Sequence, residues 1–165
     1  MPRVLSDIEI AAILAEPKET GRGQLTRLEN IAKGVSKYHR GRTKVRCKSG
    51  RKLSLRVSTN AKRANGFSVI LSYLSRGREI NLIRCNGYHG PHTNNLEKQT
   101  IPKGTFHVHR LTERYQAFGR GEHYAEPTTE YCSAASALEY LCNRFSIIDG
   151  TDKNSGYTKR RPLLE

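Results

Sequence analysis

Residues 43–58 read TKVRCKSGRKLSLRVS, and this stretch decides the fold. Apolar and polar side chains alternate over residues 43–48 and again over residues 52–58, while residues 49–51 have the composition of a turn. Alternation with a period of two is typical of strands that bury one face. We therefore predict a hairpin with one apolar face. Its other face would carry five cations, which are Lys44, Arg46, Lys48, Lys52 and Arg56.

Further elements are predicted on both sides of this hairpin. Strands are expected over residues 67–74, 79–85 and 105–110, and helices over residues 7–16, 24–38 and 134–145. Ser6 and Glu9 have the spacing of a capping box, and Ser133 is placed to cap the last helix. Residues 86–103 and 119–127 are polar, and we predict loops there. This order of elements predicts an α+β fold, with a mainly antiparallel sheet, N-terminal helices and a C-terminal helix.

The chain length of 165 residues suits one domain, which we place over residues 1–148, followed by a polar, flexible tail over residues 149–165. The four cysteines form no C-x-x-C pair and the N-terminus does not resemble a secretory signal. We therefore expect reduced thiols and a cytoplasmic protein. No apolar run approaches the roughly 20 residues that cross a bilayer, so no membrane partner is expected.

Positive charge is concentrated in one part of the chain. The net charge is +14, and residues 30–78, called here the basic block, hold 14 Lys and Arg with no Asp or Glu. The rest of the chain holds 15 basic and 15 acidic residues, so the basic block supplies the whole excess. A long block of one sign attracts polyanions. We therefore predict a nucleic-acid partner. The charge itself does not distinguish RNA from DNA, and RNA becomes the more expected partner only with the histidines and the family resemblance.

Histidines cluster further along the chain, where five of the six fall within residues 89–123. His107 and His109 are two residues apart on a predicted strand, so both should point to the same face, about 6.6 Å apart. His89 and His92 lie in the predicted loop before that strand. Three interpretations remain open: structural histidines bonded to the backbone, a three-nitrogen metal site, or acid–base catalysis.

Acid–base catalysis is the interpretation we favour from the sequence, as cleavage of RNA without a metal or other cofactor. In that hypothesis His92, His107 and His109 transfer protons, and Arg84 and Arg110 stabilise the charge on the phosphate. Arg114 and Tyr115 would contact phosphates or stack on bases nearby.

Three strings in this region also carry a resemblance to a known family. They are LIRCN at residues 82–86, GPHTN at residues 90–94 and FHVH at residues 106–109. The chain resembles a family of small, uncharacterised prokaryotic proteins with G-P-H-x-N and P-H-x-H motifs, which is distantly similar to TumE-like toxins of toxin–antitoxin systems. Phe106 stands here where that family has proline, and Asn86 where it has an acid.

The resemblance implies action on RNA, an antitoxin or other protein partner, and His92, Asn94, His107 and His109 as site residues. Two functions are therefore expected. The first is an RNA-targeting, toxin-like ribonuclease that needs no metal. The alternative is a nucleic-acid-binding subunit of a larger assembly, without catalysis.

Overall fold

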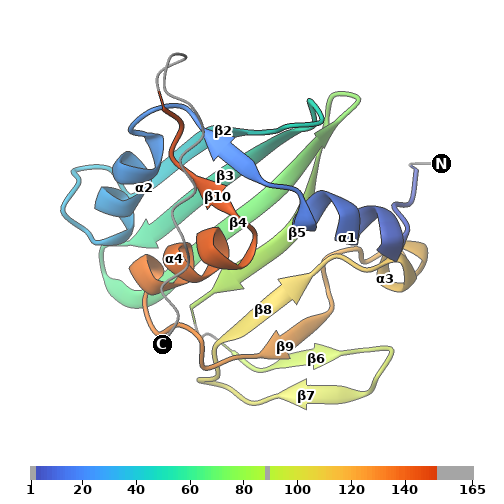
Figure 1. The fold of residues 1–165 in the computed structure, drawn as a ribbon. Coiled ribbons are helices and arrows are strands. Elements are labelled where there is room, and N and C mark those ends of the chain that lie inside the picture. Colours follow the sequence, from blue (N-terminus) through green and yellow to red (C-terminus); the bar gives the residue numbers. More distant parts are fainter. Residues whose placement is uncertain (1–2, 88–89, 152–165) are drawn as a thin grey trace, which may run out of the picture.

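The computed structural model describes residues 3–87 and 90–151, drawn in Figure 1. Along the chain the elements are α1 (Asp7–Ala15), β1 (Lys18–Thr20), α2 (Gln24–Ala32), β2 (Arg40–Cys47), β3 (Lys52–Asn60), β4 (Arg63–Ser75), β5 (Arg78–Asn86), β6 (His92–Asn94), β7 (Gln99–Ile101), β8 (His107–Arg110), α3 (Glu113–Ala117), β9 (Ala125–Pro127), α4 (Ala134–Arg144) and β10 (Ile147–Ile148). The predicted α+β class, with a C-terminal helix, is confirmed.

Eight strands form one sheet in the order β10-β1-β2-β3-β4-β5-β8-β9, and β6 pairs with β7 in a separate hairpin. Every pairing is antiparallel except that of β1 with β10. Figure 1 shows α2 and α4 on one side of the large sheet. The side that faces away from these two helices is called the outer face below.

The hairpin of β2 and β3 has the predicted alternation. Val45 and Leu53 are register partners and are both fully buried toward the helices. Arg46 and Lys52 are the next partners and both are exposed on the outer face. Lys48 lies in the turn that follows β2. Four of the five predicted cations therefore stand on the outer face of the strands, and the fifth lies at their end.

The core fills the space between the sheet and the helices. One row of register partners, Val57, Val69, Cys85 and Val108, crosses four strands, and each of these side chains is almost completely buried. Burial of such side chains contributes about 1.5–3 kcal/mol each. The apolar side of the alternation therefore holds the sheet against the helices, and the outer face is left to polar side chains.

Two helices begin at their predicted N-caps, and one helix ends earlier than predicted. α1 and α4 begin with capping boxes at Ser6 and Ser133. The second helix was predicted to reach residue 38, but α2 ends at Ala32. Gly34 adopts a φ of +72°, and the amide of Val35 donates to the carbonyl of Asn30. This closes the helix early, since glycine accepts the left-handed conformation without strain.

Several short elements were not predicted. β6, β7 and β9 lie inside the two segments that we expected to be loops, and β1, β10 and α3 were missed as well. The expected tail starts with packed residues, because the Asp149 carboxylate accepts hydrogen bonds from the Thr20 hydroxyl and the Leu25 amide. Residues 152–165 of that tail lie outside the described residues.

Gly41 gives a test of the contact between the sheet and α2. A Cβ atom at this position would lie 2.5 Å from Ile31 Cδ1 and 2.8 Å from Leu28 Cδ2. We expect Gly41→Ala to lower the free energy of unfolding by about 1–3 kcal/mol, since overpacking displaces the helix. The matched control is Gly90→Ala, where a Cβ would meet nothing within 4 Å. Urea unfolding measures both, and equal stabilities of the two variants would contradict this packing.

Candidate functional site

The outer face carries basic side chains on every second residue of β2 and on two positions of β3. Arg42 stands opposite Arg56, and Arg46 stands opposite Lys52. Like charges that face each other directly across a sheet are destabilising. The full set from these two strands comprises Arg40, Arg42, Lys44, Arg46, Lys52 and Arg56.

One of the two opposed pairs is neutralised by a carboxylate. Glu79 lies 3.3 Å from Arg42 and 3.4 Å from Arg56, and it accepts a hydrogen bond of 2.6 Å from the Ser54 hydroxyl. Burial by itself would raise the pKa of Glu79. The Ser54 hydrogen bond and the two guanidinium groups outweigh that effect and hold the pKa below its ordinary value of 4.5.

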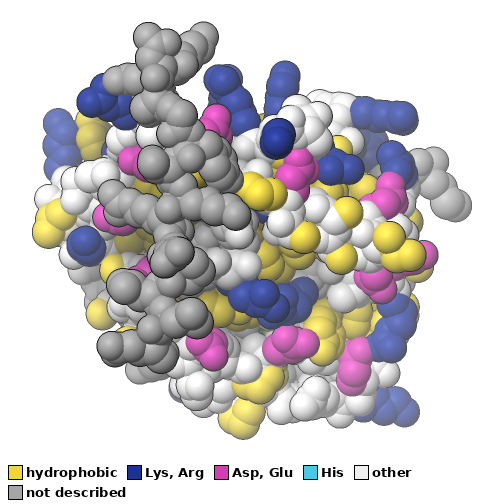
Figure 2. Space-filling view, viewed as in Figure 1, with side chains coloured by type: hydrophobic (Ala, Val, Ile, Leu, Met, Phe, Trp, Pro, Cys, Tyr) yellow, Lys and Arg dark blue, Asp and Glu magenta, His cyan; other side chains and the backbone are white. Residues whose placement is uncertain are grey.

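Of the other cations, Arg46 has Glu19 on β1 as its register partner, but the two form no ion pair in the described chain. Within residues 3–87 and 90–151, no ion pair is formed by Lys44, Arg46, Lys48 or Lys52. On the side of the molecule drawn in Figure 2, by contrast, Lys and Arg side chains lie among Asp and Glu. These four cations are thus gathered on β2, on β3 and at the turn between them. Other cations of the basic block that form no ion pair in the described chain lie before β2 and at the β3–β4 and β4–β5 turns, namely Lys37, Lys62, Arg63, Arg76 and Arg78.

A hollow of about 450 Å³ lies beside these cations. It is lined by Arg40, Gly41, Arg42, Arg56, Val57, Ser58, Ser68 and Ile70. Three guanidinium groups and two hydroxyl groups therefore surround one concave region of the outer face. Guanidinium groups bind phosphate oxygens in pairs, because their planar donors match the geometry of the anion.

A ladder of polar contacts continues from this hollow across the outer face. Arg56 donates to the Asn81 side chain at 3.0 Å, and the Asn81 amide donates to Glu122 at 3.0 Å. Glu122 in turn lies 3.8 Å from Arg84. Arg84 is the register partner of His109, so the ladder ends at the histidines. Sequence reasoning missed Glu79, Asn81 and Glu122. Alternation from Arg84 along β5 would point to Leu82 and Ile80, and it is the register shift between Ile83 and Asn81 that turns Asn81 and Glu79 to this face.

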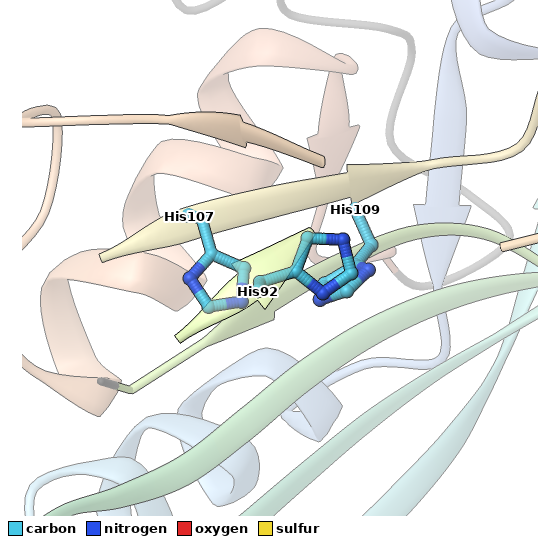
Figure 3. Close-up of side chains that lie close together, drawn as sticks. All are labelled: His92, His107 and His109. Carbon is cyan, nitrogen blue, oxygen red and sulfur yellow. The ribbon is translucent and has the colours of Figure 1, made fainter. Parts of the chain in front are cut away.

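The three histidines that we predicted to act together do converge. His107 and His109 project from the same side of β8 toward His92, as Figure 3 shows. One ring nitrogen from each lies within 4.8 Å of the others, and the three side chains are buried, with exposed fractions of 9% for His92, 1% for His107 and 4% for His109. His89 lies outside the described residues.

Main-chain carbonyls fix the proton on each imidazole. His107 Nδ1 lies 3.0 Å from the Thr105 carbonyl, His109 Nδ1 lies 3.0 Å from the Glu122 carbonyl, and His92 Nε2 lies 2.8 Å from the His123 carbonyl. A carbonyl oxygen only accepts, so each of these nitrogens carries the hydrogen. In the neutral rings the lone pairs therefore lie on Nε2 of His107 and His109 and on Nδ1 of His92.

His109 is held in its neutral form. Desolvation is the largest cause, and the positive charge of Arg84 adds to it, so that the pKa of His109 falls to about 3. Its Nε2 atom is buried and has no hydrogen-bond partner among the described residues. Near neutral pH this nitrogen therefore presents a lone pair and no proton. A general acid or base works best with a pKa near the operating pH, so His109 is suited to be a ligand more than a proton donor.

Asn94 positions β6, the strand that carries His92. The Asn94 amide donates to the Ala125 carbonyl at 2.7 Å and its Oδ1 atom accepts from the Ala125 amide at 2.9 Å. The Asn94 side chain thus bonds to the backbone of β9 as a neighbouring strand would, and it fixes β6 beside β8 and β9. The resemblance named Asn94 as a site residue, and the structure places it as a support of His92.

Three other predicted site residues do not join the histidines. Arg110 follows His109 on β8, so its side chain is on the opposite face, where it pairs with Glu126 at 3.0 Å. Arg114, on α3, pairs with Glu97. Tyr115 is only 1% exposed and its hydroxyl donates to Glu97 at 2.5 Å, so its ring packs in the interior and cannot stack on a base.

Comparison of the chain with protein-family models, with curated proteins and with solved structures gives no match. In the described part of the chain, no helix is both long and apolar enough to span a membrane. The four cysteines are all free thiols, and Cys132 is exposed. The geometry of the outer face and of the histidines is therefore what indicates a function.

Asn94→Ala tests the anchoring of β6. The change leaves the buried amide and carbonyl of Ala125 without partners, and we expect a loss of about 3 kcal/mol in the free energy of unfolding. Its neighbour Asn95 is exposed, so Asn95→Ala should change stability by about 0.5 kcal/mol or less. Chemical denaturation compares the two, and a similar small loss for both would contradict the anchoring role.

Glu79→Gln tests the neutralisation of Arg42 and Arg56. At pH 7 we expect a loss of about 1 kcal/mol, because the two guanidinium groups then face each other without a carboxylate. The folded-state pKa of Glu79 is depressed, so its contribution is present above the ordinary pKa and disappears as the pH falls through the folded value. Urea unfolding should therefore show that the difference in the free energy of unfolding between Glu79→Gln and the wild type becomes smaller from pH 7 to pH 3.

The matched control for this pH series is Glu130→Gln, since Glu130 is exposed and forms no ion pair within the described ranges. The free energy of unfolding of Glu130→Gln should equal that of the wild type at every pH. A Glu79→Gln difference that stays constant down to pH 3 would contradict the assigned ion pairs.

Proposed function

We propose that this protein binds RNA, with the phosphate backbone lying along the outer face of β2, β3 and β4. The observation that supports this most strongly is the row of unneutralised cations, Lys44, Arg46 and Lys52, beside a hollow lined by three arginines. Successive outward side chains on a strand lie about 6.6 Å apart, so the row offers repeated contacts to an extended polyanion. Such contacts release counterions and give sequence-independent affinity.

Hydroxyl groups in the hollow favour RNA over DNA in this proposal. Ser58 and Ser68 are register partners and line the hollow together with Arg40, Arg42 and Arg56. A ribose 2′-hydroxyl both donates and accepts hydrogen bonds, and a serine hydroxyl does the same. A phosphate held by the arginines would bring the neighbouring ribose close to these two serines.

The proposal is binding and does not include cleavage by histidine acid–base chemistry. His92, His107 and His109 are buried, and the pKa of His109 is far below neutrality. A metal-independent ribonuclease would need at least one histidine that exchanges protons near neutral pH with a bound nucleotide. Of the two functions expected from the sequence, the RNA-binding one is the better supported.

The test is the affinity for a fluorescently labelled 20-nucleotide single-stranded RNA, measured by anisotropy over a series of salt concentrations. We expect Lys44→Ala/Lys52→Ala to weaken binding roughly tenfold at low salt and to make the slope of log K against log[salt] shallower by about 1–2. The matched control is Lys33→Ala/Arg144→Ala, which removes the same charge from the ends of α2 and α4. It should bind as the wild type does.

Two outcomes would contradict the proposal. Equal weakening by both double variants would show that only net charge matters and that the outer face is not the binding surface. Equal affinity of the wild type for single-stranded DNA of the same sequence would contradict the preference for RNA.

A further inference from the structure

We propose that His92, His107 and His109 form a three-histidine site for a divalent zinc ion. The ligands would be Nε2 of His107, Nε2 of His109 and Nδ1 of His92, which are the ring nitrogens that carry the lone pairs. The site does not depend on RNA binding, because its residues and those of the basic row on β2 and β3 are different.

The placement of the protons supports this assignment. A histidine that ligates a metal generally donates its other ring N–H to a carbonyl or carboxylate, which orients the ring and raises its basicity as a ligand. All three imidazoles do so here, to the carbonyls of Thr105, Glu122 and His123. The three imidazoles with this arrangement lie in one buried cluster, and His109 Nε2 has no hydrogen-bond partner among the described residues.

The distances between the histidine ring nitrogens are close to those of a zinc site. One ring nitrogen from each histidine lies within 4.8 Å of the others. Nitrogens bound to one tetrahedral zinc at about 2.0–2.1 Å are about 3.4 Å apart. The required contraction is therefore at most about 1.4 Å, which is a movement of the size that rotation of imidazole rings produces. The ring planes of His92 and His109 cross at 78°, whereas those of His92 and His107 lie at 23°, so a ring of the latter pair must turn for the lone pairs to meet at one point.

The donor set selects the metal. Three imidazole nitrogens without a carboxylate match zinc sites that keep one position for water, whereas non-haem iron sites of the facial type use two histidines and a carboxylate. The nearest acidic residue in the site, Glu122, turns its carboxylate away to Asn81 and Arg84. His123 lies beside His92, but its Nε2 atom donates to the Thr93 carbonyl at 3.0 Å.

Access and local charge are also compatible with a cation. A hollow of about 300 Å³ is lined by Arg84, Arg120, Gly121, Glu122 and His123, and two of these residues supply the carbonyls that hold His109 and His92. The positive charge of Arg84 opposes a dication, but its pairing with Glu122 offsets part of that repulsion. The hollow is thus lined by the residues that orient two of the histidines, and His92, His107 and His109 themselves lie behind it.

The experiment measures zinc binding by the chelator-treated full-length protein, in competition with a chromophoric zinc indicator. All proteins carry Cys132→Ser, because this exposed thiol could bind zinc on its own. We expect one zinc per chain, and at least about 100-fold weaker binding for His107→Ala and for His109→Ala. The matched controls are His39→Ala, whose ring is exposed in the basic block, and Glu130→Gln. Both should bind as the parent does.

Cobalt substitution keeps the test decisive if an alanine variant unfolds. We expect the parent protein to give the visible absorption of tetrahedral cobalt, and His109→Gln, checked for folding by circular dichroism, to lose it. Absence of stoichiometric zinc binding by the parent would overturn the proposal. Zinc binding that is unchanged in folded His107→Ala or His109→Gln would overturn it as well.

Discussion

The structure depends on one constraint, which is that helices cover only one face of an alternating sheet. Side chains in a strand point to opposite faces in turn, so burying Val45, Leu53 and Val57 against the helices forces Lys44, Lys52 and Arg56 to the other side. The same rule places His107 and His109 together on β8, on the face that also carries Arg84. The basic row, the polar ladder and the histidine cluster are therefore parts of one surface.

Electrostatics divides that surface into two regions. Near the centre of the sheet, Glu79 and Glu122 neutralise Arg42, Arg56 and Arg84 and link them through Asn81. At the end of β2 and the start of β3, Arg46 faces Lys52 on one side and Glu19 of β1 on the other, and neither cation forms an ion pair within the described chain. Opposed like charges cost stability, so a polyanion that binds there relieves a repulsion that the folded protein itself retains.

The sequence predicted the parts that follow from local periodicity. The hairpin over residues 43–58, the shared face of His107 and His109 and the capped helices at Ser6 and Ser133 all appear. The same alternation places Arg110, the residue after His109, on the opposite face, so it argues against Arg110 as part of the histidine site. Tyr115 was misjudged because α3 has five residues, too few to show which side is buried.

Other parts depend on contacts between distant residues and leave no local signal. β1 and β10 are three and two residues long, and they form because residue 18 pairs with residue 147. β6 is fixed by Asn94 on the backbone of Ala125, and the tautomer of His92 is set by the carbonyl of His123. No periodicity in the sequence indicates these contacts.

We propose that RNA lies on the outer face of β2 and β3, and lysine footprinting would locate it there. Lysines are methylated reductively with and without single-stranded RNA, and the modification is read residue by residue by mass spectrometry. We expect RNA to protect Lys44 and Lys52, which stand on the outer face, while Lys33 at the end of α2 reacts as in the free protein. Protection of Lys33 with full reactivity at Lys44 and Lys52 would contradict it.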